Sequence, residues 1–256
     1  MDIQNDMNAS TIYTYHDCEV DFLKMPEPSL KLALTPDEIH IWYAVLDISA
    51  SELCGFAQTL SAEERMRAGR FHFQKDQNRF IARHGMLRMI LGSYMGVKAG
   101  ELRFNYGKHG KPEFTETSDK GIIRFNLSHS EGVALFAFAC GYEVGVDVEL
   151  IRDISEMEQI VDQFFSAREK AFFRALPHDM KKEAFFNCWT RKEAFIKAIG
   201  KGLSYPLDEF DSLLLSDDRA TTPSVEREAG GVSDWSIHSL RPAAEYVGAI
   251  AVRNKS

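Results

Sequence analysis

The sequence has few of the features that mark exported, disulfide-bonded or membrane-spanning proteins. It contains only 4 cysteines, which are scattered and form no CxxC pair, so neither a disulfide framework nor a zinc cluster is indicated. The first residues, MDIQNDMNAS, are polar and acidic and lack the basic start and apolar centre of a secretory signal. The longest apolar run, Val133 to Cys140, is far shorter than the roughly 20 residues that span a bilayer. We therefore expect a cytoplasmic protein without a membrane partner.

Positive charge is also scarce, because 30 Lys and Arg residues stand against 38 Asp and Glu residues, giving a net charge of -8. Such a chain binds nucleic acid or an anionic membrane only through a strongly localised basic patch, so we expect no nucleic-acid partner. What is present is a hydrophobic fraction of 45% in 256 residues. This is enough for one large domain or two small ones, and we expect a monomer.

A basic segment does occur in the N-terminal half. Between residues 63 and 88 the basic side chains outnumber the acidic ones, and they are Arg65, Arg67, Arg70, Lys75, Arg79, Arg83 and Arg88. Three of them, Lys75, Arg79 and Arg83, are spaced four apart and would share one face of a helix. A solvated helix face is the simple alternative, and no nucleic-acid recognition motif accompanies the segment.

Two blocks of the sequence follow the same plan. Each begins with a predicted strand, at 38–48 and 145–151, and continues with a serine followed three residues later by glutamate, the pattern of a helix-capping box. Each then continues into a long predicted helix, at 74–94 and 181–200. We therefore expect an α+β protein of two similar halves, residues 1–118 and 119–256, joined at the polar stretch 115–121.

Further strands are expected in the second half, where several segments are rich in β-branched and aromatic residues. These segments are IIRFN, VALFAFA, FDSLLL, WSIHSL and YVGAIAV. The stretch 216–234 is polar, contains proline and paired glycines, and is predicted to be an exposed loop.

The segment VGVDVEL alternates apolar residues with Gly145, Asp147 and Glu149. In a strand this pattern puts one face in the core and both carboxylates on the other face. Hard cations such as Mg²⁺ bind a few carboxylate oxygens together with substrate phosphates, so these two residues are candidate ligands. An amphipathic edge strand with solvated acids is the alternative that the pattern leaves open.

A second candidate group lies on the predicted helix 181–200. Trp189, Glu193 and Lys197 are spaced four apart and share one helical face. An ordinary surface ion pair between Glu193 and Lys197 explains this spacing equally well, since such pairs are common.

The segment FNLSHS ends a predicted strand and places Ser128 and His129 where an anion could meet side chains and backbone amides. No GxSxG elbow is present and adjacent strand residues point to opposite sides, so serine nucleophilic catalysis is excluded here. Upstream, GKHGKPEF sets Lys108 and Lys111 in a turn suited to phosphate, although it is not a Walker motif. Solvated lysines and an ordinary loop histidine are the alternatives.

Taken together, GKP, FNLSHS, VGVDVE and WTRKEAFIKAIGKGL resemble, in order and spacing, the motifs of the Sfp-type 4'-phosphopantetheinyl transferases. The similar region runs from about residue 110 to 210, and its core W-x-x-K-E-A-x-x-K is complete as Trp189, Lys192, Glu193, Ala194 and Lys197. The resemblance implies the 4'-phosphopantetheinyl transferase fold, in which two α/β halves related by a pseudo-twofold axis hold coenzyme A and a metal in the cleft between them.

The same resemblance implies an activity: transfer of phosphopantetheine from coenzyme A to a serine of an apo acyl or peptidyl carrier protein, releasing 3',5'-ADP. It assigns Mg²⁺ or Mn²⁺ to Asp147, Glu149 and Glu193, with Glu193 as the base for the carrier serine and Lys197 assisting the leaving group. Contacts to the coenzyme fall to the remaining candidates, in particular Ser128, His129, Lys111 and Lys197 for phosphates and Arg67, Lys75, Arg79, Arg83 and Arg65 for the nucleotide end.

The carrier protein is expected to dock near the helices between 155 and 180, with Phe164, Phe165, Phe172 and Phe173 as candidate contacts, although about half of these should be core residues. Two other readings use the same residues. One is a metal-dependent phosphohydrolase or nucleotidyltransferase, and the other is an inactive module that binds a carrier or a coenzyme. The ordered motifs argue against the first, and the intact Glu193 and Lys197 argue against the second.

Overall fold

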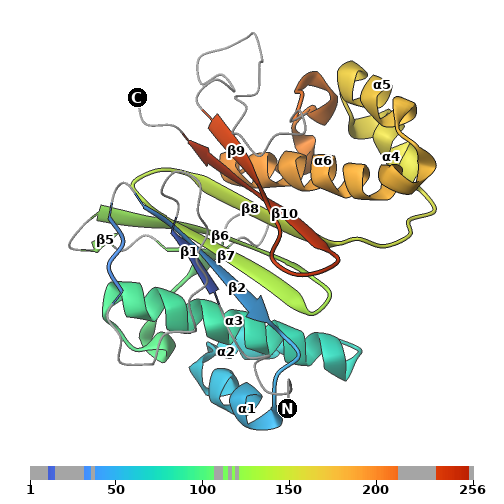
Figure 1. Cartoon of the computed structure of the whole chain (residues 1–256). Coiled ribbons are helices and arrows are strands. Elements are labelled where there is room, and N and C mark those ends of the chain that lie inside the picture. Colours follow the sequence, from blue (N-terminus) through green and yellow to red (C-terminus); the bar gives the residue numbers. More distant parts are fainter. Residues whose placement is uncertain are drawn as a thin grey trace, which may run out of the picture. The chain divides into compact units, whose positions relative to one another are not determined.

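The computed structural model describes residues 11–14, 32–35, 38–106, 112–114, 117–118, 121–212 and 235–253 (Figure 1). The chain divides into two compact units. The first unit comprises residues 1–124 and 132–141, and the second comprises residues 125–131 and 142–256. Along the chain the two units therefore alternate, because residues 125–131 belong to the second unit and residues 132–141 to the first. The expected boundary between residues 118 and 119 stays a prediction.

Among the described residues, the first unit contains a short β-ribbon, three α-helices and most of a five-stranded sheet, one strand of which continues past residue 124 into residues 125–130 of the second unit. The sheet order is β1-β2-β7-β6-β5, formed by β1 (Thr11–Thr14), β2 (Ile39–Val45), β5 (Thr117–Ser118), β6 (Gly121–Ser130) and β7 (Val133–Cys140). The ribbon pairs β3 (Asn105–Tyr106) with β4 (Pro112–Glu113), and the helices are α1 (Ala50–Thr59), α2 (Ala62–Ala68) and α3 (Gln74–Met95).

The core of the first unit forms where α3 meets the pair β2–β7. These strands are antiparallel, from Ile39 opposite Ala139 to Val45 opposite Val133, and every residue of β7 is buried. The Tyr94 hydroxyl of α3 accepts a hydrogen bond from the indole of Trp42 on β2 at 3.0 Å. An aromatic residue with a satisfied polar end therefore anchors the C-terminal part of α3 to the sheet.

The second unit contains a three-stranded antiparallel sheet with the order β8-β10-β9. Its strands are β8 (Val144–Leu150), β9 (Trp235–Leu240) and β10 (Tyr246–Arg253), and its helices are α4 (Met157–Phe164), α5 (Ala167–Ala175) and α6 (His178–Ile199). Short 3-10 helices follow at Gly202–Ser204 and Leu207–Glu209. Figure 1 shows α6, in orange, lying along this sheet.

A glycine allows α6 to approach β8 closely. A Cβ atom at Gly145 would lie 2.1 Å from the carbonyl oxygen of Ala194 and 2.5 Å from the amide nitrogen of Ala198, both backbone atoms of α6. Because backbone atoms cannot rotate away, no larger residue fits here without moving the helix. Since Gly145 and Asp147 share a strand face, α6 covers the face that carries the carboxylates.

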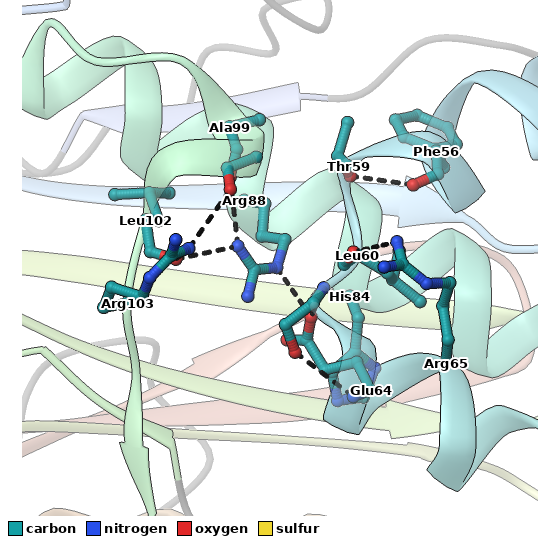
Figure 2. Close-up of polar contacts among 12 residues, drawn as sticks. Phe56, Thr59, Leu60, Glu64, Arg65, His84, Arg88, Ala99, Leu102 and Arg103 are labelled. Carbon is teal, nitrogen blue, oxygen red and sulfur yellow. Dashed lines mark hydrogen bonds and ion pairs between the residues drawn. The ribbon is translucent and has the colours of Figure 1, made fainter.

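A buried ion pair links the helices of the first unit. Ser61 and Glu64 form the predicted capping box of α2, and Glu64 also accepts a hydrogen bond from Arg88 Nε of α3 at 2.7 Å. Figure 2 shows Arg88 between Glu64 and the carbonyl groups of Ala99 and Leu102, to which it donates at 3.0 and 3.1 Å. Burial opposes ionisation of Glu64, but Arg88 and the Ser61 amide outweigh it and lower its pKa.

The second unit repeats this arrangement. Ser166 and Glu169 form the capping box of α5, and Lys192 of α6 lies 2.8 Å from Glu169. Lys192 also donates to the carbonyl groups of Leu207 and Phe210 at 2.6 and 2.7 Å, so all three of its N–H groups are bonded.

The α+β class and the similarity of the two blocks are confirmed, because each unit combines an antiparallel sheet, a capping box and a long helix joined by a buried ion pair. The long helices predicted at 74–94 and 181–200 correspond to α3 and α6. The strand predicted at FDSLLL is wrong at its start, because Asp211 and Ser212 are irregular, and the rest of that segment lies outside the described residues. No described helix is long and apolar enough to cross a membrane.

Candidate active site

The candidate site is built on the polar face of β8, which α6 covers. Asp147 pairs with Ala249 of β10 and Glu149 pairs with Val247, so both carboxylates sit on a strand fixed by a regular antiparallel ladder. Asp147 is buried, whereas Glu149 is half-buried. The predicted alternation is therefore present, but the strand is not a solvated edge, because α6 and side chains of β6 cover its polar face.

Three side chains meet at Asp147. Lys197 Nζ of α6 lies 2.5 Å from Asp147 Oδ1 and 2.9 Å from Ser128 Oγ, and Ser128 Oγ lies 2.8 Å from the same Asp147 oxygen. An ammonium group only donates, so Ser128 accepts from Lys197 and gives its own proton to Asp147. The structure thus brings together Ser128, Asp147 and Lys197, which the sequence placed on three separate motifs.

The second carboxylate oxygen of Asp147 is buried and has no hydrogen-bond partner among the described residues. A buried anionic oxygen without a partner is costly, and coordination of a cation is one way to satisfy it. The side chains present fit a divalent metal in their chemistry, since the neighbouring groups are the carboxylates Glu149 and Glu193. Within the described part of the chain, however, no three His, Cys, Asp or Glu side chains already meet closely enough to hold an ion.

Glu193 lies on α6, one turn before Lys197. Burial is the main cause that raises the pKa of its carboxyl group to about 7; Lys197 opposes this rise, and the nearby Asp147 and Glu149 add to it. Burial also raises the pKa of Glu149, while its hydrogen bond from Ser130 lowers it. Three acidic groups therefore influence one another in a partly water-excluded place, which is the setting in which perturbed carboxyl groups mark functional sites.

Two residues of this region escaped the sequence analysis. Asn126 Oδ1 accepts a hydrogen bond from the amide of Val146 at 2.9 Å, and Ser130 Oγ donates to Glu149 Oε2 at 2.7 Å. Both share a face of β6 with Ser128, and this alternation was visible in FNLSHS. His129 occupies the opposite face and is exposed, so the structure does not place it beside Ser128 at Asp147.

The basic residues predicted to contact the nucleotide lie in the first unit. Arg67 and Arg83 stand over the ring of Phe80, with guanidinium carbons 5.8 and 5.6 Å from its centre. Burial and the neighbouring Arg67 lower the pKa of Arg83 to about 10. A hollow of about 200 Å³ lies here, lined by Arg67, Arg70, Phe71 and Phe80. Two nearby cations and an aromatic wall suit a phosphate joined to a flat ring.

The other basic residues predicted to contact the nucleotide differ in their exposure and in their hydrogen-bond partners. Arg79 is held by Asp47 through two hydrogen bonds of 2.8 Å, and this contact lowers the pKa of Asp47. Lys75 is exposed at the start of α3, and Arg65 donates to the carbonyl group of Leu60. Lys111 and Lys108 lie outside the described residues.

The four phenylalanines proposed as carrier contacts divide into two groups. Phe165 and Phe173 are 1% and 2% exposed and belong to a buried hydrophobic cluster, which confirms the expectation that at least half of the four are core residues and leaves these two unavailable as contacts. Phe172 is 46% exposed, and Phe164 is partly buried against Trp189. Trp189 is partly buried and also stacks on Phe185, with ring centres 6.2 Å apart, so it packs against the core.

Comparisons with known proteins agree with these motifs. The 4'-phosphopantetheinyl transferase superfamily model matches residues 143–251, and the model for the N-terminal part of 4'-phosphopantetheinyl transferases matches residues 47–140. The 4'-phosphopantetheinyl transferase HetI of Nostoc is 38% identical over 228 residues, 89% of this chain and 92% of HetI. Sfp of Bacillus subtilis, also a 4'-phosphopantetheinyl transferase, is 31% identical over 184 residues, 72% of this chain and 80% of Sfp.

Among solved structures, a holo-(acyl-carrier-protein) synthase from Bacillus anthracis in complex with CoA is 19% identical and aligns with 44% of this chain and 96% of its own, with a TM-score of 0.34. The sequence matches are much more extensive, since the two models together span both units. On the strength of those matches and of the ordered motifs, this chain belongs to the 4'-phosphopantetheinyl transferase family.

Proposed function

We propose that this chain transfers the 4'-phosphopantetheine group of coenzyme A to a serine of an apo acyl or peptidyl carrier protein, leaving 3',5'-ADP. The observation that carries the proposal is the hydrogen-bonded cluster of buried Ser128, buried Asp147 and partly buried Lys197, in which Asp147 keeps one oxygen without a partner among the described residues. Glu149 and Glu193 lie nearby. Transfer of a phosphate from a pyrophosphate requires that the negative charge on its oxygens is neutralised, and a bound cation next to a lysine would supply this charge.

Asp147, Glu149 and Glu193 are the residues proposed to hold Mg²⁺ or Mn²⁺. When bound, the ion would neutralise charge on the pyrophosphate of coenzyme A and on the phosphate being transferred. Asp147 offers the carboxylate oxygen that has no partner among the described residues. Glu149 and Glu193 are close enough to interact electrostatically with Asp147. Binding of a dication would also offset the mutual repulsion of the three carboxylates.

Lys197 is proposed to bind the phosphate oxygens and to assist departure of 3',5'-ADP. Its ammonium group is already fixed by Asp147 and Ser128, so its position is set before the substrate arrives. A charge that is already in place stabilises the transition state more than one that must first move into position, because no free energy is needed for reorganisation. The Ser128 hydroxyl orients this group, and His129 and Lys111 stay proposed phosphate contacts.

Glu193 is proposed to accept the proton of the carrier serine, directly or through water. Burial raises the pKa of Glu193 to about 7, and a cation held beside it would keep the carboxylate ionised and therefore able to accept a proton. Its place one helical turn from Lys197 puts the base and the leaving-group lysine on the same face of α6. Positioning and charge neutralisation then supply most of the acceleration.

The nucleotide end of coenzyme A is proposed to bind the basic residues of the first unit. Arg67 and Arg83 at Phe80 supply two cations, and Lys75 is exposed and available for a phosphate. Arg79 is committed to Asp47 and would contribute through its remaining N–H groups or after exchanging that partner.

The carrier protein is proposed to dock on the α4–α5 region of the second unit. Phe172 of α5 and Met180 at the start of the following helix, α6, are large apolar residues with 46% and 54% of their surface exposed, which a partner would cover. Phe164, partly buried at the end of α4, is the third candidate of this surface.

The direct test incubates the protein with coenzyme A, Mg²⁺ and an apo carrier protein, followed by mass spectrometry of the carrier. The expected result is a carrier heavier by one phosphopantetheine group. Asp147→Asn and Glu193→Gln should reduce the turnover by at least about a thousandfold, because each removes charge from the reacting centre. No mass gain across acyl and peptidyl carriers would refute the proposal, and cleavage of coenzyme A without a carrier would favour the phosphohydrolase alternative.

A further inference from the structure

Ser130, the last residue of β6, is buried with only 6% of its surface exposed. Its hydroxyl oxygen lies 2.7 Å from Glu149 Oε2 and 3.2 Å from the amide nitrogen of Leu150, so one side chain contacts two consecutive residues of β8. Both contacts lie within the second unit.

The direction of these two hydrogen bonds follows from chemistry. The amide of Leu150 can only donate, so Ser130 Oγ must accept this bond. The single hydroxyl proton is then left for Glu149 Oε2, which at neutral pH is an acceptor. The two contacts together fix the hydroxyl rotor of Ser130 and point its proton at the carboxylate.

Ser130 belongs to a short series of side chains that cover the edge of β8 not paired with β10. Asn126 Oδ1 accepts from the Val146 amide as Ser130 Oγ accepts from the Leu150 amide, at two positions four residues apart. The amides of Val146 and Leu150 thus find side-chain acceptors at the edge of β8 where a further strand would offer carbonyl groups. Ser128 lies between these two contacts and holds Asp147.

We propose that Ser130 is a positioning residue that holds the Glu149 carboxylate in the orientation needed to bind the divalent cation. The proposal rests on the metal role proposed above for Asp147 and Glu149. A glutamate side chain has several rotatable bonds, and restricting them in advance lowers the cost of ordering it around an ion. Ligating carboxylates are commonly held by hydrogen bonds of this kind, and loss of such a contact reduces metal affinity by about 10- to 100-fold.

Ser128 does not replace Ser130 in this role. Its hydroxyl is shared between Lys197 and Asp147, so it serves the lysine and the other carboxylate. Glu149 Oε2 receives its hydrogen bond from Ser130, and the bond that Ser130 accepts from Leu150 ties this contact to the strand backbone. The hydroxyl of residue 130, rather than its size, is therefore what Glu149 requires.

The test measures the affinity of the full-length protein for Mn²⁺ alone, by electron paramagnetic resonance of the free ion, in the absence of coenzyme A. Ser130→Ala and the nearly isosteric Ser130→Cys should each raise the dissociation constant by about tenfold, because neither provides a strong donor. Ser130→Thr keeps the hydroxyl and should restore the affinity to within about threefold. In turnover, Ser130→Ala should raise the Mg²⁺ concentration for half-maximal rate by about tenfold and leave kcat at saturating Mg²⁺ within about threefold.

Ser93→Ala is the matched control. Ser93 is a serine of α3 that is 8% exposed, and its hydroxyl donates to the carbonyl group of Met89 in its own helix, so the substitution should leave Mn²⁺ binding unchanged. Circular dichroism and urea unfolding would verify that each variant is folded. Asp147→Asn separates the two proposals, because it should abolish Mn²⁺ binding if the metal site is correct.

Wild-type affinity in both Ser130→Ala and Ser130→Cys, with binding lost in Asp147→Asn, would overturn the role of Ser130 and leave the metal site standing. A folded wild-type protein that binds Mn²⁺ no better than Asp147→Asn would overturn both.

Discussion

Lys192 of α6 and Glu169 of α5 form an ion pair in which the side chains are 0% and 1% exposed. Glu169 accepts further hydrogen bonds from the Ser166 amide and from the amide and hydroxyl of Ser212, so both members of the pair are fully satisfied. Glu193 follows Lys192 directly in the chain. The pair therefore fixes the rotation of the helix that carries Glu193 and Lys197.

Breaking this pair should destabilise the protein strongly. Lys192→Met leaves Glu169 as a buried charge without its partner, and the free energy of unfolding should fall by about 3–5 kcal/mol. The double variant Lys192→Met, Glu169→Gln removes both charges and should lose less than the sum of the single variants. Urea unfolding measures both, and additive losses would show that the two side chains are energetically independent.

Gly145→Ala should push α6 away from β8. The added methyl would overlap backbone atoms of Ala194 and Ala198, so we expect a loss of about 1–3 kcal/mol in the free energy of unfolding together with reduced kcat. Gly55→Ala is the control, because nothing lies within 4 Å of the new atom in the exposed helix α1, and it should stabilise the protein by up to about 1 kcal/mol. Equal stabilities of the two variants would contradict the close packing.

His84 should make the protein less stable as the pH drops from 6.5 towards 4, whereas the raised pKa values of Glu193 and Glu149 act in the opposite direction. His84 of α3 donates from Nδ1 to the carbonyl group of Phe80, and burial together with Arg83 lowers its pKa from 6.5 to about 4. Between these values the unfolded chain binds a proton that the folded protein rejects, so the free energy of unfolding decreases by an amount on the order of 3 kcal/mol.

Urea unfolding of the wild type and of His84→Gln at pH 7 and pH 5 isolates the contribution of His84, because the variant should lose less stability than the wild type when the pH is lowered. Part of the loss should persist, because burial also lowers the pKa of His40 and of His238. An unchanged slope in His84→Gln would show that His84 titrates normally in the folded state.

Lys75→Ala should weaken the binding of coenzyme A more than it slows the chemical step. Lys75 is exposed, so removal of one phosphate contact should raise KM for coenzyme A by about three- to tenfold with kcat nearly unchanged. The effect should shrink at high salt, because exposed charges are screened. Lys98→Ala, another exposed lysine of the first unit, is the control, and equal effects of both would place the nucleotide elsewhere.

Local patterns were sufficient to predict much of the fold. The capping boxes at Ser61 and Ser166, the two long helices and the alternation around Asp147 are all encoded within a few residues, so the sequence alone revealed them. The family could be predicted because its motifs occur in this sequence in the same order, and the family models confirm it.

Contacts between distant segments were not predictable in the same way. Arg88 belonged to a basic segment in the sequence, yet it is 1% exposed because Glu64 reaches it from another helix. Ser130 and Asn126 form hydrogen bonds with β8, although β7 lies between β6 and β8 in the sequence. No local feature of FNLSHS indicates that β8 is its partner. Gly145 did carry a signal, since a glycine inside a strand often marks a close approach of another backbone.

The alternation of the two units along the chain limits how the second unit can be produced as a separate fragment. A fragment that starts at residue 119 would contain β7 but lack β2, its antiparallel neighbour. All eight residues of β7 are buried, so such a fragment would expose an apolar strand with open hydrogen-bonding groups, a template for aggregation. Soluble expression of the second unit therefore requires removal of β7 from the fragment, with a new linker between residues 131 and 142.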